Sequence, residues 1–388
     1  MKKVVILGGG FAGVQAAITL QKSKQFDVTL VSDRDYLYVY PISIWIPVYI
    51  KEFNDVKIPL GKIQKQFGFN VKVDTIKNVN SQQSQVILES GSLSFDYLII
   101  AIGAEKVQHK GGQFVTSICG KPEQSLEIRN QIDTLVAKGN GRIAIGFGGN
   151  PKDKSAVRGG PAFELIFNIH NYLKRNKIRN NFELTFFAPM EEPGARMGGS
   201  SLKMLDKMFA NYNINKHFGK KIKEFVSDGV IFEDDSKLES DMTMFIAAGS
   251  GHSALAGWGL PLNEAGFVKI NDFGQVPGFN NIYAIGDVAA LEGPDWIAKQ
   301  GHMAELMGRN AAYNILQQEK GLTHYKGYRA HLNILCVMDT GNGAAFVFRN
   351  GKRAFLIPLP VIGHWIKRGW GRYAKLTKIS AFPTFQNI

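Results

Sequence analysis

Cysteine is scarce in this chain of 388 residues, which contains only Cys119 and Cys336. Two cysteines exclude a disulfide framework in a chain of this size, and they exclude a zinc site with four thiolate ligands. The eight histidines show no ligand spacing, such as a pair four residues apart. The sequence therefore predicts no metal site, and it leaves the two thiols either a chemical role or simple packing.

Long apolar runs are also missing. The longest one, residues 36–50, is interrupted by Pro41 and Pro47 and is shorter than the roughly 20 residues that a spanning helix needs. Only four apolar residues separate Lys3 from Gly8, which is too few for the apolar region of a secretory signal. We expect neither a membrane-spanning helix nor a cleaved signal peptide.

Acidic residues are absent from residues 340–388, although the whole chain has 33 of them against 46 Lys and Arg, for a net charge of +13. The eight basic residues of this tail are Arg349, Lys352, Arg353, Lys367, Arg368, Arg372, Lys375 and Lys378. A localised basic tail predicts contact with an anionic surface, either a membrane or nucleic acid. No nucleic-acid-binding motif accompanies it, so we expect no nucleic-acid partner.

A glycine-rich turn follows the first predicted strand, residues 4–7, and precedes a predicted helix over residues 14–20. In such a Gly-x-Gly-x-x-Gly turn, the glycines allow a tight turn, a close approach of backbone to a pyrophosphate, and packing of helix on strand. A second predicted strand, residues 27–31, is followed by a carboxylate at the spacing expected for a ribose contact. The residues expected to bind the dinucleotide here are Gly8, Gly10, Phe11, Ala12, Gly13, Ser32, Asp33 and Arg34.

Two later strand ends belong to the same pattern. Residues 93–101 are predicted to form one buried strand, and residues 281–285 another. Since doubly wound sheets bind ligands at the carboxyl ends of their strands, Ala101, Gly103, Gly286 and Asp287 join the expected cofactor site. Between these two predicted strands, 93–101 and 281–285, lies a second αβ region, with strands predicted at 142–146 and 183–188 and a helix at 162–175.

Three segments, taken in their order along the chain, resemble those of the two-dinucleotide-domain flavoprotein reductases: the glycine turn, residues 96–103 and residues 286–290. The resemblance implies an α/β fold with two Rossmann-like domains, the second inserted in the first, and FAD bound at the first fingerprint. We expect the FAD-binding domain at 1–110 and 251–330, the second domain at 111–250, and a C-terminal quinone- and membrane-associating region at 331–388.

Within this superfamily, residues 32–45, 160–164 and 299–305 resemble those of sulfide:quinone oxidoreductases, relatives of type II NADH dehydrogenases and flavocytochrome c sulfide dehydrogenase. The resemblance implies electron transfer from a small reductant, sulfide or a related sulfur species, through FAD to a quinone. The alternative is a type II NADH:quinone oxidoreductase. Against it, the second-domain turn at 146–153 lacks a third glycine in register, and Pro151 removes a backbone donor.

The resemblance also implies a redox cysteine pair beside the flavin. Cys119 and Cys336 match two family positions, but Arg158 stands where a third cysteine is expected. Cys336 could act alone, with its thiol pKa lowered by Arg158, or Cys119 could replace the missing partner if the two Cα atoms lie within about 7 Å. The donor could instead be another molecule, or the chain could be a non-catalytic flavin-binding partner at a membrane.

Three further residues complete the predicted catalytic set of Cys336, Cys119, Glu164, Lys299 and Arg158. Glu164 is a proton relay by resemblance, or an acid that the helix dipole favours at the N-terminal turn. Lys299 is predicted to bind a flavin or quinone carbonyl; the alternative is an ordinary lysine exposed to solvent. Arg158 would bind an anionic donor, and otherwise lies on a surface loop.

Residues 361–378 predict an amphipathic helix. Apolar residues recur there at steps of three and four, namely Ile362, Trp365, Ile366, Trp370, Tyr373 and Leu376, and lysines and arginines fill much of the rest. Trp and Tyr beside basic residues are typical of a helix lying in the headgroup plane, although an ordinary packing helix is the alternative. We expect a peripheral membrane protein, on the cytoplasmic face by default; a homo-oligomer is compatible with the sequence.

Overall fold

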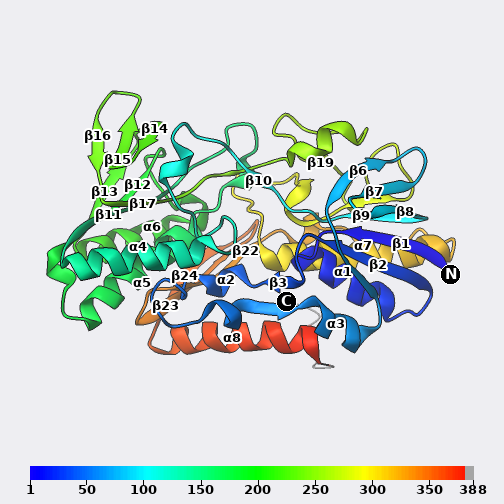
Figure 1. The fold of residues 1–388 in the computed structure, drawn as a ribbon, viewed down its shortest axis with the longest axis horizontal. Helices are drawn as coiled ribbons and strands as arrows, with labels where there is room; N and C mark the ends of the chain where they lie inside the picture. Colours follow the sequence, from blue (N-terminus) through cyan, green and yellow to red (C-terminus); the bar gives the residue numbers. More distant parts are fainter. Residues whose placement is uncertain (381–388) are drawn as a thin grey trace.

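The computed structural model describes residues 1–380, and one half of the molecule is built on a five-stranded parallel sheet (Figure 1). The strand order is β20-β9-β1-β2-β5, formed by β1 (Lys2–Leu7), β2 (Phe26–Ser32), β5 (Asn70–Val73), β9 (Tyr97–Ile100) and β20 (Ile282–Ala284). Helices α1 (Phe11–Gln21) and α7 (Gly301–Glu319) pack against each other beside it. Burial on both faces explains why β9 is continuously apolar.

Residues 93–101 do not form one strand, which corrects the prediction. The first part belongs to β8 (Gly91–Ser94), in an antiparallel meander with β6 (Ile76–Asn80) and β7 (Gln85–Leu88), and the second part is β9 of the parallel sheet. Between them the Asp96 carboxylate accepts a hydrogen bond from the backbone N–H of Lys3 at 2.6 Å. This contact fixes the change of direction.

A second parallel sheet, ordered β13-β12-β11-β17, forms the other half of the molecule. Its strands are β11 (Gly141–Phe147), β12 (Phe182–Ala188), β13 (Ile214–Phe218) and β17 (Met242–Ile246), with helices α4 (Gln124–Lys138), α5 (Gly160–Arg175) and α6 (Gly199–Asn211). An antiparallel meander of β14 (Ile222–Val226), β15 (Gly229–Phe232) and β16 (Lys237–Glu239) extends this half. Aromatic packing fills its core, as in the stacked pair Phe163–Phe186.

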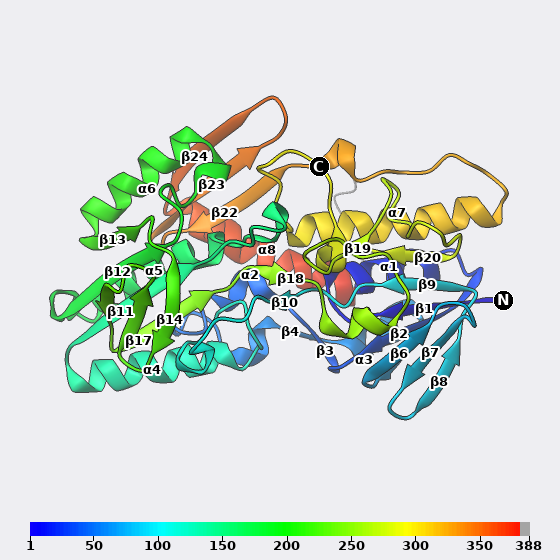
Figure 2. The same cartoon turned by 90° about the horizontal axis from the view of Figure 1, so that it is seen from above.

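The chain passes between the halves through two short strands, β10 (Glu105–Lys106) and β18 (Gly249–Ser250), which pair antiparallel (Figure 2). Since β20 then returns to the first sheet, the second sheet is inserted within the first. The predicted mixed α/β dinucleotide-binding fold is therefore confirmed. Two further short pairs, β3 (Tyr36–Tyr38) with β4 (Lys57–Pro59) and β19 (Val268–Lys269) with β21 (Ala289–Ala290), lie in the first half.

The C-terminal region is an antiparallel sheet followed by a long helix. Strands β22 (Ile334–Asp339), β23 (Gly343–Arg349) and β24 (Ala354–Pro360) precede α8 (Ile362–Ile379). In Figure 1, α8 runs along the lower side of the molecule, and it contacts this sheet together with α2 (Tyr40–Ser43) and α3 (Leu60–Phe67). Within residues 1–380, no helix is both long and apolar enough to cross a membrane. The predicted C-terminal region extends to residue 388, so its last eight residues lie outside the described part.

Candidate functional site

Close contacts between backbone atoms explain two of the glycines in the first turn. Strand β1 ends at Leu7 and α1 begins at Phe11. Gly8 has a φ of +112°, and a Cβ there would overlap the carbonyl oxygen of Ala101, while a Cβ on Gly13 would overlap that of Gly8. These two glycines are explained by close packing of the turn, helix and neighbouring strand.

Gly10 has no such explanation within the protein. A Cβ built on it meets nothing within 4 Å, and it stands at the N-terminus of α1, where no side chain caps the helix. Uncapped backbone N–H groups at a helix N-terminus attract an anion. The open space in front of Gly10 therefore fits the close approach of a cofactor pyrophosphate.

The other predicted cofactor residues surround this turn. Ser32 is buried, and its Oγ accepts a hydrogen bond from the Arg34 N–H at 3.2 Å, whereas the Asp33 carboxylate is exposed at the end of β2. Gly103 has a φ of +78°, and a Cβ on it would meet nothing within 4 Å, while a Cβ on Gly286 would lie 3.0 Å from that of Ala12. The carboxyl ends of β1, β2, β9 and β20 thus meet at one edge.

Asp287 and Arg158 form an ion pair across the two halves of the molecule. Burial opposes ionisation of Asp287, but Arg158, Lys299 and Lys106 outweigh it and hold the pKa of the carboxyl below its ordinary value. Asp287 is therefore a carboxylate at neutral pH. The chain separation of 129 residues explains why the sequence did not reveal this pairing.

Lys299 is buried and binds backbone rather than solvent. Its Nζ donates to the carbonyl oxygens of Asp287, at 2.9 Å, and of Ala289, and it lies 3.6 Å from the ring centroid of Phe267. Burial lowers the pKa of Lys299 to about 8, against the opposing charges of Asp287 and Asp153. Lys299 fixes the Gly-Asp loop, and its role toward a flavin or quinone carbonyl stays a prediction.

The second-domain turn differs from the first. Twelve residues, 148–159, separate β11 from α5. A Cβ on Gly146 would meet Phe187 and one on Gly148 would meet Phe245, so aromatic packing explains these glycines. The Asn150 amide donates to the Gly249 carbonyl at 2.8 Å and fills the loop. The loop does not form a tight pyrophosphate turn.

Cys336 lies on β22 among apolar side chains and near Glu164 and Lys367. Burial, with a smaller contribution from the charge of Glu164, raises the pKa of its thiol to about 12, against the opposing charge of Lys367. Arg158 pairs with Asp287 instead. The prediction that Arg158 lowers the pKa of Cys336 is therefore wrong.

Cys119 has different neighbours. It is buried, and the charges that interact with it belong to Arg158, Lys106 and Tyr40. Both cysteines are free thiols. The structure thus places one thiol beside Arg158 and the other beside Glu164, and a direct partnership of the two stays a prediction.

Glu164 is the fifth residue of α5, so it lies beyond the N-terminal turn where we expected it. It is buried, forms an ion pair with Lys367 of α8, and accepts a hydrogen bond from the Asp339 N–H at 2.7 Å. Burial raises the pKa of Glu164 despite the opposing charge of Lys367. Asp339 in turn binds His364 Nδ1 at 2.7 Å, which makes a buried polar network between α5, β22 and α8.

The sequence did not reveal Lys367 as part of this network, because it was counted with a basic solvent-facing side of the helix. The available signal was spacing: Lys367 and Lys378 fall on the same three- and four-residue steps as Gly363, Gly371 and Ala374. All five are buried. Small residues mark the face of a helix that packs closely against the rest of the protein. A lysine on that same face therefore points into the protein and not into solvent.

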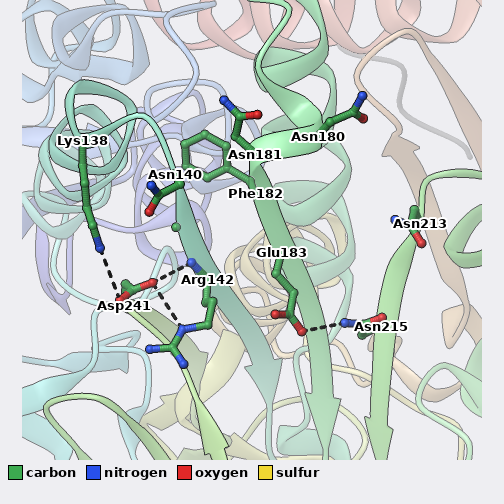
Figure 3. Close-up of a pocket in the computed structure, with 11 residues that line it drawn as sticks. Lys138, Asn140, Arg142, Asn180, Asn181, Phe182, Glu183, Asn213, Asn215 and Asp241 are labelled. Carbon is green, nitrogen blue, oxygen red and sulfur yellow. Dashed lines mark hydrogen bonds and ion pairs between the residues drawn. The ribbon is translucent and has the colours of Figure 1, made fainter.

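A polar hollow of about 510 Å³ lies elsewhere, at the N-terminal ends of β11 and β12 (Figure 3). Its charged groups pair within the hollow: Arg142 binds Asp241, and Glu183 accepts from Asn215 at 2.8 Å. The glycine turns lie at the opposite, carboxyl ends of their strands, so the hollow is separate from the candidate site. No cluster of three or more potential metal ligands occurs within residues 1–380, and the absence of a metal stays a prediction.

The two αβ sheets, the second inserted in the first, and the open glycine turn define a class of protein, the dinucleotide-binding oxidoreductases. A family model described as pyridine nucleotide-disulphide oxidoreductase matches residues 2–308. The chain belongs to this family, and FAD is its cofactor, as predicted.

Comparison with individual proteins narrows the relationship. The chain is 29% identical to the sulfide-quinone reductase of Aquifex aeolicus over 99% of this chain and 93% of the other. The structure of the sulfide:quinone oxidoreductase from that bacterium matches with a TM-score of 0.88 over 100% and 94% of the two chains, at 26% identity. A type II NADH:quinone oxidoreductase of Staphylococcus epidermidis is 21% identical over 91% and 92%. The predicted resemblance to sulfide:quinone oxidoreductases is confirmed.

Proposed function

We propose that this protein is a quinone reductase that takes electrons from sulfide or a related small sulfur species and passes them through FAD. One observation carries the proposal: the turn at Gly10 is short and open for a cofactor, whereas twelve residues separate β11 from α5 and Asn150 in that loop is hydrogen-bonded to the Gly249 carbonyl. The second domain therefore has no tight pyrophosphate turn of this kind, which argues against NADH as the donor. The likeness to sulfide-quinone reductase supports the choice of donor and acceptor.

FAD, when bound, supplies a two-electron acceptor that separates donor and quinone chemistry in time. The chain's own residues bind and orient it. The Gly10 turn would hold the pyrophosphate at the N-terminus of α1 and Asp33 would meet the ribose, while Lys299 fixes the Gly286–Asp287 loop. On the second-domain side, the Cys336 thiol and the buried Glu164 carboxyl are the groups that exchange protons with the donor or the quinone.

Type II NADH:quinone oxidoreductase is the second candidate, since such a protein is among the relatives. The long loop at 148–159 argues against it. We therefore expect sulfide to reduce the bound flavin in anaerobic stopped-flow experiments, and micromolar NADH to leave it oxidised. Rapid bleaching of the flavin by NADH would favour the second candidate. Turnover with a soluble quinone analogue is a separate test, because a non-catalytic flavin-binding partner would show none.

The same experiment tests the thiol. We expect Cys336→Ser to slow sulfide-dependent bleaching at least tenfold, because Cys336 stands at a position that the resemblance assigns to a redox cysteine. Cys119→Ser, measured in the same assay, tests whether the second thiol, beside Arg158, takes part. Equal rates for wild type and Cys336→Ser would exclude cysteine chemistry at β22.

We infer further that α8 lies on a membrane surface. Its outward residues are large and apolar, with Ile362 59% and Trp365 62% exposed, and Ile366, Trp370 and Leu376 are also exposed. Val361 and Ile357, just before the helix, extend this surface. Arg372 is exposed beside it. An apolar face rimmed by basic side chains suits the boundary between anionic headgroups and acyl chains.

A point substitution tests this surface better than removal of the helix, because α8 also contributes buried residues to the protein. We expect Trp365→Ser/Ile366→Ser to weaken partition onto anionic liposomes about a hundredfold, since burying each side chain is worth roughly 1.5–3 kcal/mol. Leu322→Ser removes an exposed apolar side chain outside α8 and should leave partition unchanged. Equal co-sedimentation of the double variant and wild type would refute the membrane surface.

A further inference from the structure

Two cations beside Asp287 lack sufficient protein partners. Arg158 forms one hydrogen bond, from Nη2 to Asp287, so most of its five-donor fork has no acceptor within residues 1–380. The Lys106 ammonium has no acceptor or carboxylate partner in the same part of the chain, although Lys106 is half-buried. Partly buried cations with so few protein partners favour an anion beside them.

The charges around this point do not balance. Arg158, Lys106 and Lys299 all act on Asp287, and Asp153 also acts on Lys299, so three cations face two carboxylates. Burial and the repulsion of Arg158 lower the pKa of Lys106, while Cys119 and Asp287 oppose this. The cluster therefore carries an excess of positive charge that the described residues do not neutralise.

The pyrophosphate of FAD is one source of negative charge, but it has its own cradle at Gly10 and α1. Arg158 comes from the loop before α5, and Lys106 from β10, which pairs with β18 between the two halves. Cys119 lies in the same cluster and also follows β10 in the chain. Arg158 and Cys119 thus belong to the second domain and Lys106 to the connection between the halves, whereas the pyrophosphate turn belongs to the first.

We propose that Arg158 and Lys106 form an anion site that selects a small anionic electron donor, such as hydrosulfide or a persulfide, over a neutral one. This deepens the proposed function and rests on it. Arginine's planar fork binds an anion through directed charge-assisted hydrogen bonds, and lysine adds a point charge. Arg158, in the place of a family cysteine, would then hold the donor by charge instead of by a sulfur–sulfur bond.

The test uses the FAD-loaded protein and thiocyanate, a small anion that does not reduce flavin, at constant ionic strength. We expect a saturable change in the flavin absorption spectrum, and a dissociation constant at least tenfold higher in Arg158→Gln and in Lys106→Gln. Arg158→Lys should recover part of the affinity. Lys154→Gln removes an exposed lysine of the same loop, paired with Asp295, and should change nothing.

Unchanged thiocyanate affinity in Arg158→Gln would overturn the proposal. Loss of FAD from both variants, with anion affinity retained in the remaining holoprotein, would assign the cations to the cofactor pyrophosphate and would also overturn it. The proposed function fails differently, by the absence of sulfide-dependent quinone reduction in wild type. Thiocyanate binding that depends on Arg158 would still establish the anion site in that case.

Discussion

Replacing Gly10 by valine should produce a folded protein without colour. Gly10 is the one glycine of the fingerprint with no protein atom near its missing side chain, and its φ of −84° is open to any residue. A valine side chain there would occupy the space through which the pyrophosphate approaches the N-terminus of α1. We expect the affinity for FAD to fall by at least about a hundredfold, measured by cofactor titration of the apoprotein.

Gly351→Val serves as a control for the substitution itself, because a Cβ at Gly351 also meets nothing within 4 Å and Gly351 lies in the turn between β23 and β24 of the C-terminal sheet. Gly13→Val is the opposite case, since its side chain would overlap the Gly8 carbonyl and should unfold the turn. The circular dichroism spectrum of Gly10→Val should match wild type. Full retention of FAD by this variant would mean that the pyrophosphate does not approach Gly10.

Removing the charge of Lys367 should destabilise the protein by about 3–5 kcal/mol, because Lys367→Met leaves the Glu164 carboxylate buried without its cation. Glu164→Gln/Lys367→Met should recover most of this loss. Lys375→Met, a half-exposed lysine on the same helix, should change the free energy of unfolding by less than about 0.5 kcal/mol. Urea unfolding of the four proteins measures these differences.

The loss in Lys367→Met should depend on pH with a definite sign. Burial already raises the pKa of Glu164 above its ordinary value, and removing Lys367 raises it further. Between the unfolded and folded pKa values the folded state binds the extra proton, so stability falls as pH rises through that interval. The deficit relative to wild type should therefore be small near pH 5 and grow toward pH 8. A deficit independent of pH would mean that Lys367 acts through packing alone.

Local features were predictable from the sequence. The turn from β1 through Gly8 and Gly13 into α1 is formed by residues close together in the sequence, so the spacing of its glycines was enough to predict it. The ends of α5 and α8 were also close to prediction, since helical spacing is local. The strand at 93–101 failed because nothing in its apolar run signals that β8 and β9 join different sheets.

The charged contacts of the site were not predictable, because they join distant residues. Arg158 meets Asp287 across 129 positions, and Lys367 meets Glu164 across 203. Composition placed Lys367 and Lys378 on a basic outer side of α8, whereas both are buried. What decides the direction of such a lysine is a carboxylate on another element, and only the fold brings the two together.

If α8 lies on a membrane surface, as proposed, two buried lysines determine how the molecule is oriented against the bilayer. Lys367 ties α8 to α5 through Glu164, and Lys378 ties its other end to α1 and α7 through Gln15, at 2.5 Å, and Glu305, at 2.9 Å. Neither half can tilt relative to the helix without breaking a buried contact. With α8 in the headgroup plane, the tilt of the molecule and the height of its cofactor turn above the lipid become fixed properties of the fold.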